Sequence, residues 1–138
     1  MTCTSSPRSA EASTAGYSKK SLIDKLGLKA GMKARLIRAV YQAPAGLDRS
    51  QDAPLDFIHL FTKDRAELQR EFPLQARALA PAGMLWVSWP KGSSGVKTDL
   101  SETIVRGIGL GTGLVDVKVC AVDAIWSGLK FVIRRKNR

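Results

Sequence analysis

Cysteine and histidine are scarce in this chain: of its 138 residues, two are cysteine and one is histidine. Cys3 lies in a polar stretch and Cys120 in an apolar one, so we expect no disulfide framework. The cysteines and His59 are too far apart in sequence to give a metal-binding spacing, so we expect no metal site. No apolar run approaches the ~18 residues of a membrane span, so we expect no membrane partner.

A secretory signal is also missing from the beginning of the sequence. Residues 1–16 are rich in Ser, Thr and Ala and contain no apolar stretch. We expect residues 1–16 to form a disordered N-terminal tail and residues 17–138 to form a single domain of a cytoplasmic protein.

Acidic residues are few relative to basic ones, and 22 Lys and Arg against 12 Asp and Glu give a formal charge of +10. The excess of positive charge is spread along the chain, a distribution more typical of charge that maintains solubility than of a continuous basic stripe that binds a partner. One local cluster stands out and is a candidate polyanion contact, consisting of Arg134, Arg135, Lys136 and Arg138.

Helical and strand patterns alternate along the rest of the chain. Ser18 can cap a short helix that ends near Leu26. Residues 32–40 alternate as a strand does, and residues 41–54 read as a loop. The apolar run 55–61 is typical of a buried parallel strand.

The second half continues the alternation. Asp64 and Glu67 have capping-box spacing at the start of a helix that Pro73 is expected to kink or split. Residues 84–89 form the next buried strand, and Asp99 with Glu102 resembles a second capping box before another helix. Residues 115–123 and 129–135 are expected to form the last two strands.

This order predicts an α/β protein with three layers. Strands separated by helices imply right-handed crossovers and a parallel sheet, whereas the short last connection requires an antiparallel hairpin. We therefore expect a Rossmann-like, mostly parallel sheet of about five strands, with helices on both faces and a C-terminal hairpin.

Two resemblances follow from these patterns. The strand–helix–strand–helix–hairpin order, with the opening Lys25-Leu-Gly-Leu-Lys-Ala-Gly-Met32, resembles a reduced Rossmann-like methyltransferase domain. Such enzymes carry a glycine-rich loop after the first strand, but this chain has no glycine between Arg38 and Gly46, and two strands of the full fold are not found. The glycines at 107, 109, 111 and 113 follow a helix, and helix termination explains them better.

A more specific resemblance covers roughly residues 16–138. It rests on five strings: Ala15-Gly-Tyr-Ser18-(x)3-Leu22, Leu79-Ala-Pro-(x)-Gly-Met-Leu-Trp-Val-(x)-Trp-Pro-Lys91, Ser94-Gly-Val-(x)-Thr-Asp-Leu100, Gly113-Leu-Val-Asp-(x)-Lys-Val-Cys-Ala-Val-Asp123 and Trp126-Ser-Gly-Leu-(x)-(x)-Val-Ile-Arg-Arg135. With these strings the chain resembles the bacterial family called domain of unknown function 3052. That resemblance implies a fold and a bacterial origin, and no activity.

Ligands of open parallel sheets bind at the carboxyl ends of the strands, which directs attention to the loops that follow them. The loop after residues 84–89 carries hydroxyls, ammonium groups and backbone N–H groups that suit an anion. We therefore predict a ligand site formed by Lys91, Ser93, Ser94, Gly95 and Lys97, with Asp123 and Trp126 nearby.

Other polar residues of the strands receive structural interpretations. His59 in an apolar strand is expected to be a hydrogen-bonded core histidine. Asp116 and Lys118 are expected to form a surface ion pair, and Asp99 can cap a helix.

Three functions remain open at this stage. The first is a non-catalytic, reduced Rossmann-like module that binds a small anionic ligand or a protein partner, without a cofactor, because no catalytic constellation is found. The second is a diverged transferase-type enzyme that uses the Lys91–Lys97 loop. The third is a basic nucleic-acid-binding protein, although its aromatic residues are not interleaved with basic ones.

Overall fold

The computed structural model describes residues 21–49 and 52–137. The tail predicted for residues 1–16, the cap predicted at Ser18 and the basic residue Arg138 lie outside the described residues. The first described helix has Ser21 as its N-cap, and the Ser21 hydroxyl accepts a hydrogen bond from the Asp24 N–H.

The described chain alternates strands and helices much as its sequence predicts. Two short 3-10 turns lie at Gly92–Ser94 and Arg135–Asn137. The elements are α1 (Leu22–Leu26), β1 (Ala34–Ile37), β2 (Leu55–Phe61), α2 (Arg65–Arg77), β3 (Leu79–Pro90), α3 (Glu102–Gly111), β4 (Leu114–Ala121) and β5 (Trp126–Ile133).

One mixed sheet carries all five strands in the order β1-β2-β3-β5-β4. β1, β2 and β3 are parallel, whereas β5 is antiparallel to both of its neighbours, β3 and β4. The predicted α/β class and a five-stranded sheet with a hairpin of β4 and β5 are therefore confirmed, but the sheet is mixed rather than mostly parallel, because two of its strand pairings are parallel and two are antiparallel. The hairpin does not extend the edge of the sheet in chain order, because its second strand lies between β3 and β4.

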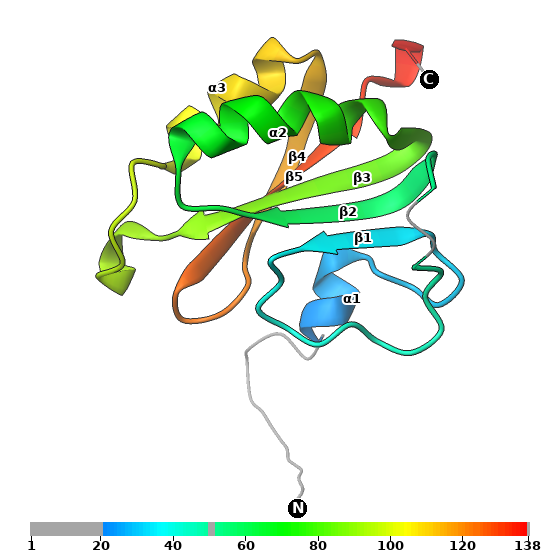
Figure 1. The fold of residues 1–138 in the computed structure, drawn as a ribbon, viewed down its shortest axis with the longest axis horizontal. Coiled ribbons are helices and arrows are strands. Elements are labelled where there is room, and N and C mark those ends of the chain that lie inside the picture. Colours follow the sequence, from blue (N-terminus) through cyan, green and yellow to red (C-terminus); the bar gives the residue numbers. More distant parts are fainter. Residues whose placement is uncertain (1–20, 50–51, 138) are drawn as a thin grey trace, which may run out of the picture.

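The first face of the sheet is covered by α2 and α3, which lie side by side in Figure 1. Alternate residues of the central strands point to this face because side chains of a strand alternate between faces. They pack against Leu68 and Phe72 of α2 and Val105 of α3, and the strands contribute Leu55, Ile58, Leu60, Leu85, Val87, Leu129 and Phe131.

The second face is covered by the short helix α1 and by residues 38–49, the loop that follows β1. Its smaller apolar cluster contains Leu26, Leu28, Phe57 and Trp86. The indole N–H of Trp86 donates to the Leu26 carbonyl oxygen over 2.9 Å, which anchors the end of α1 on the sheet. Helices on both faces make the three layers that the sequence predicts.

The loop after β1 also runs along the outer edge of that strand. The Asp48 N–H donates to the Met32 carbonyl and the Ala34 N–H donates to the Asp48 carbonyl, both over 2.9 Å, in a parallel bridge between Lys33 and Asp48. These bonds satisfy backbone groups that an uncovered edge strand would expose.

Pro73 does not split α2, so the splitting alternative of that prediction is wrong. The helix runs from Arg65 to Arg77 with Pro73 inside it. Proline removes one backbone donor, but the fully buried Leu68 and Phe72 hold this helix against the sheet. Tertiary packing therefore outweighs the local penalty.

Neither predicted carboxylate caps the helix that follows it. Asp64 stands at the N-cap position of α2 without a side-chain cap hydrogen bond, and the Arg65 N–H donates instead to Asp99 Oδ1 over 2.7 Å. The second helix, α3, is capped by Ser101, whose hydroxyl accepts from the Ile104 N–H. Asp99 reaches the start of α2 because the loops after β2 and β3 lie together, where the Thr98 hydroxyl donates to the Lys63 carbonyl over 2.6 Å.

The predicted ion pair between Asp116 and Lys118 is also wrong. A β-bulge between these residues breaks the simple alternation of side chains. Asp116 accepts instead from Arg106 Nε of α3 over 2.9 Å, and this guanidinium also contacts Glu102. The hydrogen bond from Arg106 holds the pKa of the Asp116 carboxyl below its usual value.

Candidate functional site

The carboxyl ends of β1, β2 and β3 meet at one edge of the sheet because these strands are parallel. A cavity of about 290 Å³ opens there, and we call it the edge cavity. Its walls come from the end of β1, from the turn between β2 and α2 and from the start of β5, and its lining residues are Arg38, Phe61, Thr62, Lys63, Asp64, Glu67 and Trp126.

Arg38 forms the β1 side of this cavity in an unusual backbone conformation. Its φ of 56° lies in the left-handed region, which costs a residue with a side chain about 1–2 kcal/mol. The guanidinium compensates through contacts to the next strand and helix. Nε donates to the Phe61 carbonyl over 2.8 Å, and Nη2 bonds Glu71 over 3.1 Å and pairs with Glu67 over 3.3 Å.

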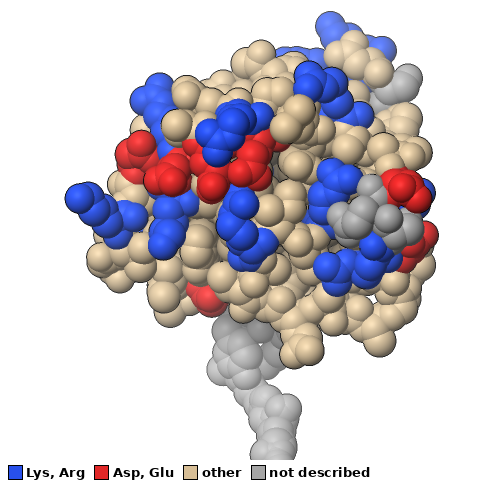
Figure 2. Space-filling view, in the orientation of Figure 1, with Lys and Arg blue, Asp and Glu red and all other residues tan. Residues whose placement is uncertain are grey.

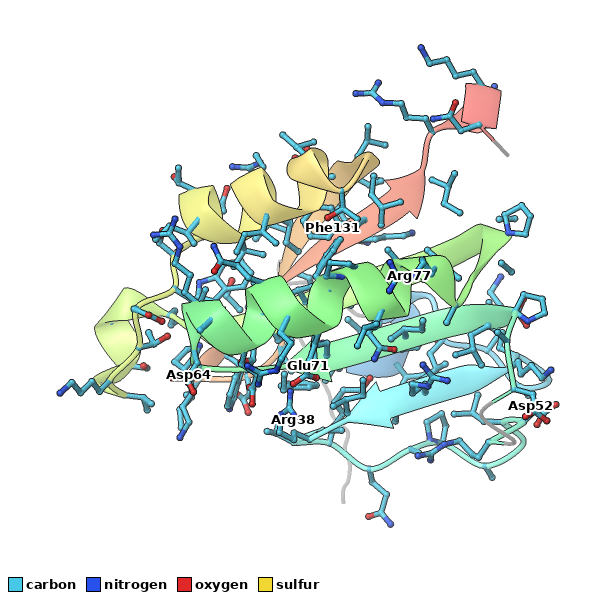
Figure 3. The ribbon with its side chains drawn as sticks, turned by 45° about the horizontal axis from the view of Figure 1, so that its top comes forward. Arg38, Asp52, Asp64, Glu71, Arg77 and Phe131 are labelled. Atoms are coloured by element: carbon cyan, nitrogen blue, oxygen red, sulfur yellow. The ribbon has the colours of Figure 1, made fainter. Side chains whose placement is uncertain are left out.

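Figure 3 shows Arg38 and Glu71 next to each other across the gap between the end of β1 and α2. Two carboxylates fix the orientation of one guanidinium, and the described residues offer Nη1 no hydrogen-bond partner. Backbone strain held in place by its surroundings is a recurring property of ligand sites. Arg38 is therefore a pre-oriented donor at the mouth of the cavity.

The floor of the edge cavity is aromatic. The Phe61 and Trp126 rings meet edge to face with centroids 5.2 Å apart. Thr62 donates a short hydrogen bond to Glu67 and accepts one from the Asp64 N–H, which fixes the turn into α2. The cavity thus combines an aromatic surface with two cationic side chains, Arg38 and Lys63, and two carboxylates, Asp64 and Glu67.

A buried polar network lies next to Phe61. His59 stacks on the Phe61 ring with centroids 4.2 Å apart. Its Nδ1 is 2.8 Å from the Tyr41 hydroxyl and its Nε2 is 2.7 Å from the Ser88 hydroxyl. Burial lowers the pKa of His59 to about 3 and raises that of Tyr41, so both are neutral near pH 7. The prediction of a hydrogen-bonded core histidine is confirmed.

A second cavity of about 470 Å³, which we call the loop cavity, adjoins the first. It lies between the turn after β2 and the loop before α3, and it shares Lys63 and Asp64 with the edge cavity. Lys97, Thr98 and Asp99 complete its lining. One Asp99 oxygen is engaged in capping α2, and the Thr98 hydroxyl is bonded to Lys63, so the walls are tied together.

The structure divides the predicted ligand residues between these two cavities and the surface. Trp126 lines the edge cavity and Lys97 lines the loop cavity. Asp123 shapes the hairpin turn, where its Oδ1 accepts from the Ile125 and Trp126 N–H groups. The remaining predicted residues line neither cavity: these are Lys91, Ser93, Ser94 and Gly95.

The loop after β3 has its own local hydrogen bonds. The Ser94 hydroxyl accepts from the Val96 N–H, and Gly95 adopts a left-handed φ of 80°. Its Lys91 N–H donates to the Ile125 carbonyl, which ties the loop to the hairpin. In this loop the Gly-Ser-Ser-Gly sequence builds a turn.

The basic C-terminal cluster lies at the other end of the sheet. β5 begins at Trp126 beside the edge cavity and ends at Ile133, and Arg134, Arg135 and Lys136 follow it as exposed residues. Figure 1 shows this end of the chain far from the end of β1. Figure 2 shows Lys and Arg at several separate places on the visible face, with acidic side chains gathered between some of them.

Sequence reasoning missed most of the lining of the edge cavity. Thr62, Lys63 and Asp64 follow the buried strand that ends at Phe61, and that position is the signal that could have identified them. Arg38 lies inside the strand predicted over residues 32–40 and Glu67 lies inside the next helix, so neither carries this signal. Among the described residues no helix is long and apolar enough to cross a membrane, and no group of His, Cys, Asp and Glu side chains could hold a metal ion.

Comparisons with known proteins support the fold class. Two solved structures, titled "A Pericyclic Reaction enzyme" and "The structure of LepI complex with SAM", are 9% identical to this chain, with TM-scores of 0.53 and 0.52. Each alignment covers 82% of this chain and 39% of the other protein. Magnesium protoporphyrin IX methyltransferase from Synechocystis PCC 6803, solved with bound SAH, is 11% identical over 61% of this chain and 47% of its own, with a TM-score of 0.47.

The chain spans less than half the length of these proteins. The likeness to the two structures with TM-scores of 0.53 and 0.52 concerns the Rossmann-like fold alone. No family model and no curated protein matches this chain. The resemblance to domain of unknown function 3052 is therefore not supported by these comparisons.

Proposed function

We propose that this domain binds a small molecule that carries an aromatic ring and a zwitterionic amino-acid group, and that it belongs to a diverged transferase-type enzyme. S-adenosylmethionine (SAM) is the candidate ligand. The observation that carries the proposal is the composition of the edge cavity, where an aromatic floor lies beside two cationic and two acidic side chains.

The charges of the edge cavity favour a zwitterion over a simple anion. Arg38 and Lys63 suit a carboxylate, because a guanidinium or ammonium forms charge-assisted hydrogen bonds with it. Asp64 and Glu67 suit an ammonium or sulfonium group. The partly exposed Trp126 ring, which packs against the buried Phe61, suits a flat ring or a cation, because aromatic faces attract both. SAM carries an adenine ring, a sulfonium centre and an α-amino-acid group, and so presents all three features.

The location of the cavity agrees with this ligand class. It opens at the carboxyl ends of parallel strands, where α/β folds bind small molecules. The fold likeness to LepI, whose structure is known in complex with SAM, supports SAM as the first probe. A glycine-rich loop does not follow β1, and the left-handed Arg38 makes the turn there instead.

Two adjoining cavities favour a transferase over a module that only binds. Group transfer requires two reactants held side by side, because alignment lowers the entropic barrier of a bimolecular step. The edge cavity and the loop cavity share Lys63 and Asp64, so ligands in both would be neighbours. The loop cavity, with Lys63 and Lys97, is assigned to a second reactant that carries an anionic group.

Calorimetry and tryptophan fluorescence with SAM and S-adenosylhomocysteine test the proposal. Both ligands should bind the full chain, and Trp126→Leu should weaken binding by about tenfold or more, which is the range of one lost aromatic contact. Ile125→Ala is the matched control, because this exposed neighbour does not line the cavity.

A second pair of variants tests the charged wall. Arg38→Gln should weaken binding, whereas Arg70→Gln, an exposed change on the same helix as the partners of Arg38, should not. Absence of any heat or fluorescence change at millimolar SAM would exclude this ligand. Equal effects of Trp126→Leu and Ile125→Ala would place the site elsewhere.

A further inference from the structure

The Tyr41–His59–Ser88 network connects the loop after β1 to the middle of the sheet. Tyr41 lies in this loop three residues beyond Arg38, His59 lies on β2 and Ser88 lies on β3. His59 and Ser88 are fully buried, whereas Tyr41 is partly exposed. A buried polar group without a partner is costly, so the protons of this network must be distributed to satisfy every member.

Counting donors and acceptors selects one arrangement. A neutral imidazole has one N–H donor and one nitrogen acceptor. If His59 Nε2–H donated to Ser88, the buried Ser88 hydroxyl proton would need another acceptor, and the described residues provide none. If instead Ser88 O–H donates to Nε2, then Nδ1–H donates to the Tyr41 oxygen, and the Tyr41 proton can reach water because this side chain is partly exposed.

The same histidine also contacts the aromatic floor of the edge cavity. Its ring stacks on Phe61, and Phe61 meets Trp126 edge to face. Tyr41 lies against both the His59 and the Phe61 rings, with centroids 5.4 and 6.0 Å away. His59 is therefore the common neighbour of the loop that carries Arg38 and of the ring that lines the cavity.

We propose that His59 is a positioning residue for the edge cavity: held as the Nδ1–H tautomer by Ser88, it donates to Tyr41 and so fixes the loop after β1 that carries Arg38. The tautomer follows from the network alone, whereas the effect on a ligand rests on the proposed function. Ser88 determines which imidazole nitrogen of His59 carries the proton, and the hydrogen bond to Tyr41 couples the position of the imidazole to the loop.

The tautomer can be measured directly because the chain contains a single histidine. Nitrogen-15 spectra of the imidazole in the full chain, without an affinity tag, should report a protonated Nδ1 and an unprotonated Nε2 near pH 7. A protonated Nε2 would overturn the assignment. This measurement requires no ligand and is independent of the proposed function.

A matched pair of variants tests the positioning role, because each removes one hydroxyl from the same histidine. Tyr41→Phe removes the hydroxyl that the loop contributes, whereas Ser88→Ala frees the tautomer but keeps the bond between Tyr41 and Nδ1, because a hydroxyl can accept from Nδ1–H or donate to Nδ1. Amide hydrogen exchange of residues 38–47 should become faster in Tyr41→Phe and stay near wild type in Ser88→Ala. Equal acceleration in both variants, or in neither, would overturn the positioning role whether or not SAM binds.

Ligand affinity provides a second readout of the same pair. If SAM binds the wild-type chain, Tyr41→Phe should weaken binding by about fivefold or more and Ser88→Ala by less than about twofold. Equal weakening would contradict the role of the loop. Failure of SAM to bind the wild-type chain would count against the proposed function alone, because the exchange and tautomer measurements still decide the role of His59.

Discussion

The two faces of the sheet are built on different principles. The face under α2 and α3 has the larger apolar cluster, with Leu, Ile, Val and Phe side chains of the strands packed against those of the helices, and polar contacts such as Arg106–Asp116 join α3 to β4. The face under α1 has a smaller apolar cluster and contains the His59 network and the aromatic contacts that lead to the edge cavity. One face supplies most of the packing, and the other positions polar groups near the site.

This division has an energetic meaning. Apolar packing tolerates the exchange of one apolar side chain for another of similar size, but it is sensitive to a change in volume, because removal of a buried methylene leaves its neighbours without contacts and lowers stability. The stability of a buried polar network depends on the protons that its members carry, and removal of one hydrogen-bond partner leaves another buried group unsatisfied. The two faces should therefore respond to different perturbations. The stability of the face under α2 and α3, which we call the helical face, should depend on the size of its side chains. The stability of the face under α1, which we call the α1 face, should depend on pH and on its hydroxyl groups.

The largest effect is expected on the helical face. Phe131 is fully buried, meets Phe72 edge to face at 5.2 Å and lies directly under Gly109 of α3. Phe131→Ala should lower the free energy of unfolding by about 3–5 kcal/mol, measured by urea denaturation. Exposed Leu74→Ala on α2 serves as the control and should change stability little. A loss of less than about 1 kcal/mol in Phe131→Ala would refute the view of this face as the packing core.

An intermediate effect is expected on the α1 face and depends on pH. The pKa of folded His59 is lowered to about 3, below its unfolded value of about 6.5. Below pH 6.5 the unfolded chain therefore binds a proton that the folded chain does not, so stability falls as pH falls toward 3. The slope is about 1.4 kcal/mol per pH unit, or about 2 kcal/mol by pH 5.

Urea denaturation between pH 7 and pH 5 measures this slope, and His59→Asn is the control because it removes the titrating group. Between pH 7 and pH 5 the free energy of unfolding of the wild-type chain should fall by about 2 kcal/mol more than that of His59→Asn. Identical pH dependence in the two proteins would mean that His59 is not held neutral by the fold.

The smallest effect is expected at the N-terminal end of α2, at the margin of the helical face. Asp99→Ala removes the carboxylate that caps α2 and should cost about 1 kcal/mol, whereas Asp64→Ala should cost little because Asp64 makes no cap hydrogen bond. Thermal unfolding of both variants compares them directly. A larger loss in Asp64→Ala would favour the local capping box that the sequence predicts.

The fold was largely predictable because its signals are local. Alternation, apolar runs and glycine positions give the order of elements, and the short last connection gives the hairpin. The pattern does not disclose that Asp99 caps a helix 34 residues earlier, because that contact joins two loops across the sheet edge.

The site was predictable only in part. Trp126 and Lys97 follow from the rule that ligands bind at the carboxyl edge. Arg38 does not, because nothing in its sequence context indicates a left-handed backbone or a guanidinium that reaches Glu71. The Lys91–Gly95 segment has suitable chemistry, but it forms a turn with its own local hydrogen bonds and lines neither cavity.

The position of β5 has a consequence for synthesis of the chain on the ribosome. This strand is made after β4, yet it lies between β3 and β4 and pairs with both. Until residues 126–133 have emerged, one edge of β3 has no partner and β4 cannot join the sheet through β5. Unpaired strand edges of nascent chains are prone to pair with other molecules. Folding of this sheet is therefore expected to be completed late, and a chain arrested before Trp126 should depend more on chaperones than the full chain does.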